Sequence, residues 1–289
     1  MGLLASIPSP SSGALDLGPF TVHLYGLTLL AAIAVATYVA GRRWVARGGD
    51  WDLIFRCAVW GVAAGIVGAR LYHLATSWSE VPDEWWGPVA IWKGGLGVWG
   101  GIAAGCLAGG VVAKRAGADV WLLADCLAPG LLLAQAVGRL GNWWNQELFG
   151  KPTDLPWGLE IDPVNRPVDL LDHETFHPTF LYEALWNVGA AALLVFVIER
   201  RLRPRPPGLF AAYVALYCAG RFWVELLRVD AAHELLGLRL NAWVSLAGVV
   251  VGVVWYVLSQ RRGRAPRARA PKAPAASGPK MTVPRRAKG

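Results

Sequence analysis

A stretch of polar side chains follows an apolar run that is long enough to cross a membrane. The run is 120–137, and the stretch is 138–150, GRLGNWWNQELFG, with one cation, two Asn, one Gln, one Glu and three Gly. If the helix expected for the run continues, Arg139, Asn142 and Gln146 share one face, because their spacing is i, i+3 and i+7. A guanidinium fork beside amide groups is suited to holding an anion such as phosphate.

A second set of polar residues recurs every four positions later in the chain. Tyr213, Tyr217, Arg221 and Glu225 form one stripe on a helix, and Arg228 continues its polar end. Two interpretations stand: an Arg–Glu pair that merely neutralises itself, or the lining of a polar cavity. Charges in lipid are costly, at roughly 2.5–3.5 kcal/mol each on insertion scales, so such residues face protein or water.

Two arginines, Arg139 and Arg221, are therefore predicted to stand near the same face of the membrane. A phosphate held at that depth belongs to a phospholipid headgroup. Tyr25 adds a phenol at the end of the first apolar segment, and His177 begins the run HPTFLYE before the fifth. Arg70 is a further cation inside an apolar segment, for which a structural and a functional role are equally compatible with the pattern.

The composition supplies the frame that these groups need. Hydrophobic residues make up 55% of the 289 and charged residues only 17%, against about 25% charged in a soluble domain. The apolar runs are continuous and approach the roughly 20 residues of a helical span, so they predict helices rather than strands. We expect an all-α polytopic membrane protein with seven transmembrane helices, at 22–40, 54–76, 94–113, 120–137, 179–198, 208–226 and 241–259.

The basic residues predict the orientation of these spans. Lys and Arg follow the first, third, fifth and seventh spans, and such residues favour the cytoplasmic side. The N-terminus is then outside and the C-terminus cytoplasmic. The long connection 138–178, with seven acids against three basic residues, is predicted to form a small extracytoplasmic head.

Three parts of the chain are expected on this basis. Residues 1–21 are an extracytoplasmic N-terminal arm, 22–260 are the seven-span membrane domain, and 261–289 are a basic cytoplasmic tail. The tail has ten basic residues and no acid, with abundant Ala and Pro, which predicts disorder. Its position favours contact with anionic membrane lipid over nucleic acid, so no nucleic-acid partner is expected.

Cysteines and glycines suggest packing rather than cofactor chemistry. The four cysteines all fall in apolar segments and form no CxxC pair, so we expect no disulfide, no metal and no cofactor. The glycine-rich stretch 94–101 has two interpretations. It either allows close helix packing in lipid or leaves room for a lipid headgroup.

Residues 138–150 resemble the GR-x-GN-x-x-N-x-E-x-x-G signature of the bacterial prolipoprotein diacylglyceryl transferases. The resemblance covers about residues 6–260. Supporting matches are His23-x-Tyr25-Gly26, Gly68-Ala69-Arg70-Leu71, His177-Pro178-Thr179-x-Leu181-Tyr182-Glu183 and Gly220-Arg221-Phe222-x-x-Glu225-x-x-Arg228.

The resemblance implies a multi-pass enzyme of the bacterial plasma membrane with its active site on the extracytoplasmic side. Such an enzyme transfers the diacylglyceryl group of phosphatidylglycerol to the lipobox cysteine thiol of a pre-lipoprotein. A thioether forms and glycerol phosphate is released. The implied partners are phosphatidylglycerol, pre-lipoprotein signal peptides with a lipobox cysteine, and membrane lipid.

The resemblance also points to particular residues. Those that match functional positions of the family are Tyr25, Arg139, Asn142, Glu147, Gly150, Tyr217, Arg221 and Glu225. We expect Arg139, Arg221, Asn145, Gly150, Arg70 and Arg228 to bind substrate, and His177 to be a further catalytic candidate.

One position departs from the family pattern. Some members carry a His before the Gly-Gly of the third span, proposed as catalytic, and this chain has Trp99 there. Because an indole cannot act as a base, the thiol proton must go elsewhere, and His177, Glu147, Glu225 and Tyr25 are the candidates. The alternative function is a membrane transporter of a small anionic or lipid substrate. The outward clustering of charges and the absence of sequence repeats favour the transferase.

Overall fold

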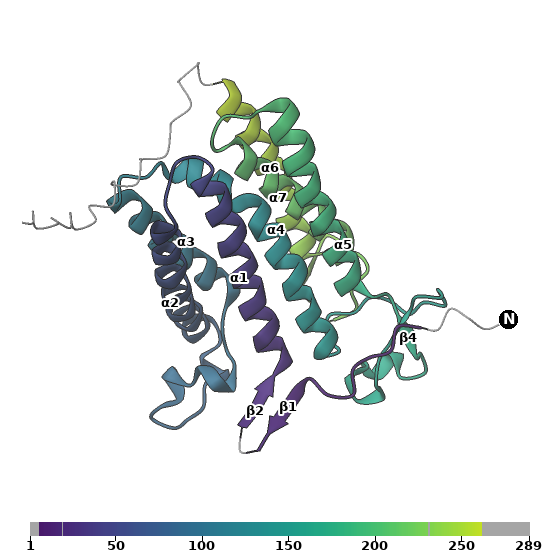
Figure 1. Cartoon of the computed structure of the whole chain (residues 1–289). Helices are drawn as coiled ribbons and strands as arrows, with labels where there is room; N and C mark the ends of the chain where they lie inside the picture. Colours follow the sequence, from purple (N-terminus) through teal and green to yellow (C-terminus); the bar gives the residue numbers. More distant parts are fainter. Residues whose placement is uncertain (1–5, 19, 231, 262–289) are drawn as a thin grey trace, which may run out of the picture.

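Helices account for most of the chain in the computed structural model, which describes residues 6–18, 20–230 and 232–261 (Figure 1). Each of the seven predicted spans corresponds to one helical segment, so the all-α prediction is confirmed. The segments are α1 (Leu24–Val45), α2 (Trp51–Thr76), α3 (Val98–Arg115), α4 (Val120–Trp144), α5 (Thr179–Ala192) with its π-helical continuation η6 (Leu193–Leu202), α6 (Gly208–Glu225) and α7 (Leu240–Arg261).

Among the described residues, three short antiparallel strand pairs lie outside the helices, one before α1, one between α4 and α5 and one between α6 and α7. They are β1 (Ala14–Leu17) with β2 (Phe20–His23), β3 (Leu159–Glu160) with β4 (Thr175–Phe176), and β5 (Glu234–Leu235) with β6 (Leu238–Arg239). Single 3-10 turns complete the loops: η1 (Trp78–Glu80), η2 (Gly87–Val89), η3 (Ile91–Lys93), η4 (Pro163–Asn165) and η5 (Val168–Leu170).

Several helix ends differ from the predicted spans, and three of them bear on the site. Val22, predicted to begin the first span, belongs to β2. The third helix begins at Val98 rather than at 94, because Gly94 and Gly95 adopt left-handed φ values of 91° and 73° that interrupt a helix. The fourth helix runs past 137 to Trp144, so the predicted head connection begins with two further helical turns.

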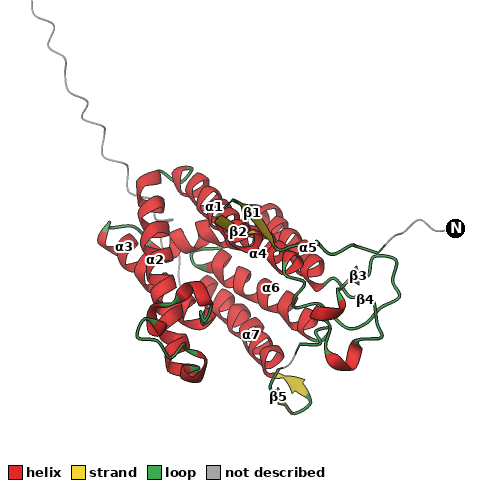
Figure 2. Cartoon of the chain, turned by 90° about the horizontal axis from the view of Figure 1, so that it is seen from below, coloured by secondary structure: helices red, strands yellow, loops and turns green. Residues whose placement is uncertain are grey.

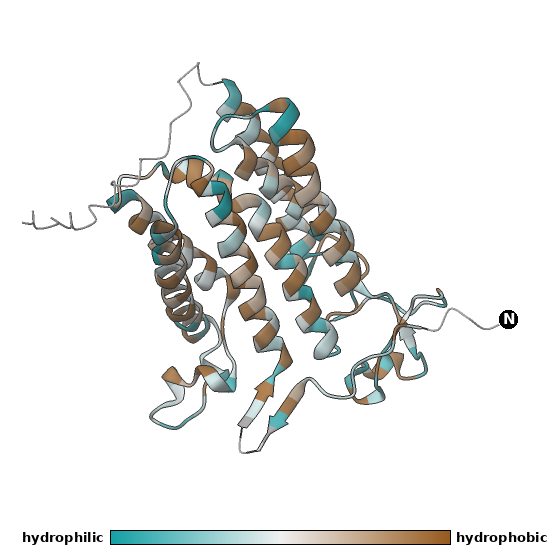
Figure 3. Cartoon of the chain, viewed as in Figure 1, coloured by the Kyte–Doolittle hydropathy of each residue, from teal (hydrophilic) through white to brown (hydrophobic). Residues whose placement is uncertain are grey.

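Five of the helical segments are long and apolar enough to cross a membrane: α1, α2, α4, α5 with η6, and α7. Two shorter helices are less apolar, because α3 is rich in glycine and ends in Lys114 and Arg115, and α6 contains Arg221 and Glu225. Polar residues gather mainly at helix ends and in the loops (Figure 3). Large apolar side chains such as Leu107 and Leu30 are exposed on the outside of the bundle, as expected for contact with lipid. The chain is therefore an all-helical, multi-pass membrane protein.

Close backbone contact explains the small residues of the predicted third span. A Cβ added to Gly68 of α2 would lie 2.3 Å from the Cβ of Ala104 in α3, and one added to Gly100 would lie 2.2 Å from the carbonyl oxygen of Gly68. The close-packing interpretation is thus confirmed for this helix pair. Figure 2 shows α2 and α3 together on one side, with α4 and α6 further inside the bundle.

Helix α4 is the scaffold of the molecule. It packs extensively on α1 and also contacts α5 and α6, and its apolar core around Leu132 joins Leu194 and Leu209. At its C-terminal end the connection to α5 forms a head with its own core of Phe149, Leu159, Ile161, Phe176 and Phe180. The N-terminal segment joins this head through a bond of 2.8 Å from the N–H of Ile7 to the carbonyl oxygen of Gly158. The predicted basic tail lies outside the described residues, apart from Arg261 at the end of α7.

Candidate functional site

The signature stretch begins as helix and ends as a tightly turned loop. Arg139 and Asn142 project from the last turns of α4, as the i, i+3 spacing predicted. Beyond the helix, Gln146 and Leu148 adopt left-handed φ values of 50° and 59°, which non-glycine residues rarely adopt and which recur at functional sites. Glu147 lies between them and accepts a bond of 2.7 Å from Nδ2 of Asn142 to Oε1. The strained loop therefore brings Glu147 back to the end of α4.

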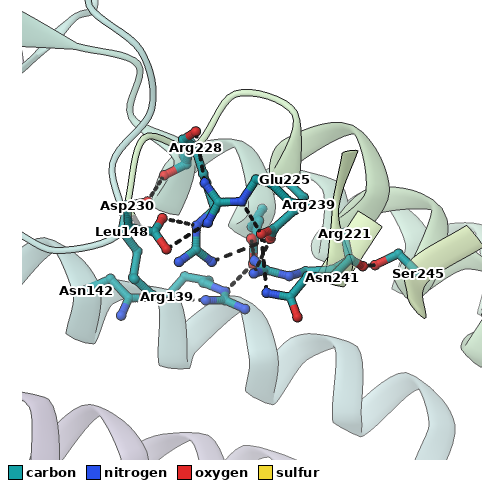
Figure 4. A network of polar contacts seen from close by, with 12 residues as sticks. Arg139, Asn142, Leu148, Arg221, Glu225, Arg228, Asp230, Arg239, Asn241 and Ser245 are labelled. Atoms are coloured by element: carbon teal, nitrogen blue, oxygen red, sulfur yellow. Dashed lines mark hydrogen bonds and ion pairs between the residues drawn. The ribbon is translucent and has the colours of Figure 1, made fainter. Parts of the chain in front are cut away.

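A carboxylate on α5 joins the two predicted arginines. Glu183 forms ion pairs with Nε of Arg139 from α4 and with Nη1 of Arg221 from α6. Each guanidinium has a second partner: Nη1 of Arg139 donates to Oδ1 of Asn142 at 3.2 Å, and Nη2 of Arg221 meets Oε2 of Glu225 at 2.6 Å (Figure 4). Tertiary packing of α4, α5 and α6 thus places both forks in one cluster.

Glu225 is the fully buried centre of the cluster. Its side chain has 0% exposure, and besides Arg221 it meets Nη1 of Arg228 at 3.7 Å and Nε of Arg239 at 2.8 Å. Asn241 at the start of α7 adds a hydrogen bond of 3.3 Å. A buried carboxylate is tolerated only when it is compensated in this way, so Glu225 orients the surrounding arginines.

Asp230 closes the outer edge of the cluster. It accepts from Nε of Arg228 at 2.6 Å and pairs with Nη2 of Arg239 at 2.8 Å. Burial alone would raise the pKa of the Asp230 carboxyl, but the hydrogen bond and charge of Arg228 and the charge of Arg239 outweigh it and lower that pKa. Asp230 therefore stays ionised and holds both arginines.

The ion-paired cluster carries a surplus positive charge. Among the described residues it comprises four arginines (139, 221, 228 and 239) and three carboxylates (183, 225 and 230). One more negative charge would balance it. A phosphodiester carries one negative charge that is shared by two non-bridging oxygens, and guanidinium forks can bind such a pair of oxygens together.

Two tyrosines of the prediction lie beside the cluster. The ring of Tyr25 packs on the backbone of α4, where a Cβ added to Gly141 would lie 2.6 Å from ring atom Cδ2. This places the phenol within electrostatic reach of Arg139 and Glu147. Tyr217, one helical turn from Arg221, stacks on Tyr213 with ring centroids 6.1 Å apart.

His177 and Gly150 form a junction between the head and the bundle. The N–H of Gly150 donates to the carbonyl oxygen of His177 at 2.9 Å, and a Cβ on Gly150 would lie 2.8 Å from the Cβ of His177. Gly150 also forms a β-bridge with Arg228. The imidazole lies 3.1 Å from the hydroxyl of Tyr182, and burial together with the charge of Lys151 lowers the pKa of His177. These residues connect two loops at the edge of the cluster.

Arg70, Asn145 and Trp99 lie in other surroundings. The buried guanidinium of Arg70 donates to the carbonyl oxygens of Pro88, Gly94, Gly95 and Gly87 at 2.6–3.0 Å. It therefore holds the connection between α2 and α3, and its predicted role in binding substrate remains a prediction. Asn145 caps α4 next to Gly13 of the N-terminal segment, and Trp99 is 54% exposed on the first turn of α3.

Sequence reasoning assigned no role at the site to four members of the cluster: Glu183, Asp230, Arg239 and Asn241. Glu183 had a signal, because it is a charge inside an apolar span and ends the HPTFLYE run. Arg239 and Asp230 lie in a short polar connection, where charges are ordinary. Only the hairpin β5–β6 and the start of α7 turn them toward Glu225.

The fold and the cluster together define a class: a multi-pass membrane protein with a largely buried cluster of ion-paired arginines and carboxylates where α4, α5 and α6 meet. A family model described as prolipoprotein diacylglyceryl transferase matches residues 12–258, and the chain belongs to this family. The resemblance noted from the signature is thereby confirmed.

Relatives agree with this assignment. The chain is 48% identical over 267 residues to phosphatidylglycerol–prolipoprotein diacylglyceryl transferase 2 of Streptomyces coelicolor, covering 90% of this chain and 82% of the relative. It is 50% identical to the phosphatidylglycerol–prolipoprotein diacylglyceryl transferase of Frankia alni, covering 90% and 69%. A protein of the same name from Cutibacterium acnes is 49% identical, covering 89% and 88%. Family membership favours the transferase over the transporter alternative.

Proposed function

We propose that this chain transfers the diacylglyceryl group of phosphatidylglycerol to the cysteine thiol of a prolipoprotein. Membership of the family supports the reaction type and the two substrates. The observation that carries the proposal to particular residues is the pairing of Arg139 and Arg221 across Glu183. It brings two guanidinium forks from separate helices to one place, where they fit a phospholipid phosphate.

The reaction balances without a further reactant. The cysteine sulfur attacks the glyceryl carbon that carries the phosphate, an S–C bond forms, and the C–O bond breaks. The bonding electrons remain on the phosphate oxygen, and the thiol proton goes to a base. The leaving glycerol phosphate gains negative charge as the bond breaks, so Arg139 and Arg221 bind the transition state more strongly than the substrate.

Glu147 is the base that the geometry favours. Asn142 occupies only Oε1 of its carboxylate, and Tyr25 lies within electrostatic reach. By contrast, Glu225 is fully buried, and both of its carboxylate oxygens are already engaged by Arg221, Arg228 and Arg239. Glu147 would accept the thiol proton, and Tyr25 would orient the thiol or the carboxylate. Asn142 then acts as a positioning residue, because it touches both Arg139 and Glu147.

The remaining predicted residues take supporting places in this proposal. Arg228 and Glu225 hold the arginine cluster in shape. Tyr217 lines the approach one turn away from Arg221, and Gly150 lets the head loop approach the segment after α6. His177 is neutral near pH 7, because its pKa is lowered, and it serves the junction of head and bundle.

We further propose a location and an orientation. All seven helical segments cross the bacterial plasma membrane, with the N-terminus outside and the C-terminus in the cytoplasm. Support comes from the basic residues after α1, α3 and η6, which favour the cytoplasmic side. The cluster lies at the opposite ends of α4, α5 and α6, so the active site would face the extracytoplasmic side, beside a head formed by 138–178.

The test uses the full-length chain in nanodiscs that contain phosphatidylglycerol. A synthetic peptide with a lipobox cysteine is added, and mass spectrometry follows the addition of a diacylglyceryl group. Thioether formation is expected with the Cys peptide and not with a Ser peptide, and phosphatidylcholine nanodiscs should support no transfer. Arg56→Gln is the matched control for arginine variants, because Arg56 is exposed and pairs with Asp52 far from the cluster. If the Cys peptide gains no mass, the proposed function is wrong.

A further inference from the structure

One carboxylate already occupies the place that the proposed function gives to phosphate. Oε1 of Glu183 meets Nη1 of Arg221, and Oε2 meets Nε of Arg139. Each guanidinium is anchored elsewhere by its other side, Arg139 on Asn142 and Arg221 on Glu225. Glu183 thus binds the N–H groups with which the guanidinium groups of Arg139 and Arg221 face each other.

Glu183 and a phosphodiester offer the same chemistry to these forks. Each presents two oxygens and one negative charge, and guanidinium N–H groups bind both in the same geometry. The N–H groups between Arg139 and Arg221 cannot serve both anions fully at once. The Glu183 side chain is only 7% exposed, so the carboxylate is already largely closed to solvent.

We propose that Glu183 is an exchanging anion in the transfer reaction. Substrate phosphate displaces its carboxylate from Arg139 and Arg221, and the carboxylate returns when glycerol phosphate leaves. The inference rests on the proposed function and concerns the release of its product.

Product release is the step in which such an exchange is useful. Transfer converts a phosphodiester of one negative charge into a monoester that approaches two near pH 7, since the second pKa of a phosphate monoester is near 6. The arginines therefore bind the product more tightly than the substrate. When Glu183 returns, it supplies the counter-charge that Arg139 and Arg221 would otherwise lack in a buried site.

The test compares Glu183→Gln with the wild-type chain in phosphatidylglycerol nanodiscs. The amide keeps the shape of the side chain and removes its charge, so the competition disappears. We expect glycerol phosphate to bind about tenfold more tightly to the variant, measured by calorimetry. The first turnover should form thioether at a rate close to that of the wild type, and kcat should then fall about tenfold as product accumulates on the enzyme. Glu174→Gln, at an exposed position of the head, should match the wild type in both measurements.

Weaker binding of glycerol phosphate to Glu183→Gln, with the first turnover and kcat reduced equally, would overturn the exchange. It would mean that Glu183 only holds the arginines in place. If Glu183→Gln does not fold, Glu183→Asp retains the charge but is too short to bridge both forks. It should also bind glycerol phosphate more tightly, and weaker binding would refute the proposal. A wild-type chain that forms no thioether would instead overturn the proposed function, and the binding comparison would still decide the exchange.

Discussion

Replacing Arg221 by Gln gives the sharpest test of the arginine site. Its guanidinium joins Glu183 of α5 to Glu225 of its own helix, and the proposed function directs the same group at the leaving phosphate. Removing one charged contact that strengthens in the transition state typically lowers kcat by about 10²–10³, or about 2.7–4 kcal/mol. We therefore expect kcat for thioether formation to fall by about that factor in Arg221→Gln.

The effect on folding should be smaller than for a typical buried ion pair. Breaking such a pair is destabilising by about 3–5 kcal/mol when a charge is left uncompensated. Here Glu183 retains Arg139, and Glu225 retains Arg228 and Arg239, so the loss should fall below that range. Thermal unfolding in nanodiscs measures this directly and separates loss of activity from loss of folded protein.

Arg221→Lys adds a geometric criterion. An ammonium group keeps the charge but lacks the planar fork that can meet two oxygens in one plane. Its activity should lie between those of the wild type and the Gln variant, at about a tenth of the wild type. Arg56→Gln is the control, because its exposed pair with Asp52 contributes little. Folded Arg221→Gln with kcat within twofold of the wild type would refute the phosphate role of this residue.

Three further predictions concern residues around the cluster. Glu147→Gln should lower kcat by about 100-fold with little change in stability, since a general base typically contributes a factor of about 10²–10⁴ to the rate. The pH dependence of kcat should also become flatter. A loss of less than threefold would exclude Glu147 as the base. Burial and the charge of Lys151 lower the pKa of His177, so the unfolded chain binds more protons than the folded chain between the folded pKa and about 6.5. The contribution of this residue to stability therefore rises with pH through that window and is fully present above it. The unfolding temperature of the wild type should drop as the pH falls from 7 to 5, and an equal drop in His177→Asn would contradict this origin. Arg70→Gln leaves carbonyl oxygens of the loop between α2 and α3 without their donor. The variant should lose about 2 kcal/mol of stability and keep an unchanged KM for phosphatidylglycerol. A raised KM at unchanged stability would instead support the predicted contact with substrate.

The helices were predictable because the hydrophobicity and the length of the apolar runs suffice for them. Continuous apolar runs of about 20 residues have few alternatives to helix in lipid. The ends were less predictable, because they depend on local backbone geometry. The left-handed Gly94 and Gly95 delay α3, while Trp144 is still helical because Asn145 caps α4 only afterwards.

The arginine pair shows where sequence reasoning succeeded and where it stopped. Arg139 and Arg221 stood out because a cation in an apolar span needs a partner. The intrahelical Arg221–Glu225 pair, one of two open interpretations, is present, yet Arg221 also reaches Glu183 on another helix. The intrahelical pair is therefore present as part of a cluster that α5 shares, while the lining of a polar cavity stays a prediction.

The sequence by itself determined the family, the helical frame and the charged residues that lipid does not tolerate alone. The tertiary structure decided which of these charges meet. Spacing along one helix fixes neighbours at i, i+3 and i+4, but the register between helices depends on packing of the whole bundle. That register places Glu183 between Arg139 and Arg221 and brings Arg239 to Glu225, while the folding of the loop between α2 and α3 brings its carbonyl oxygens to Arg70.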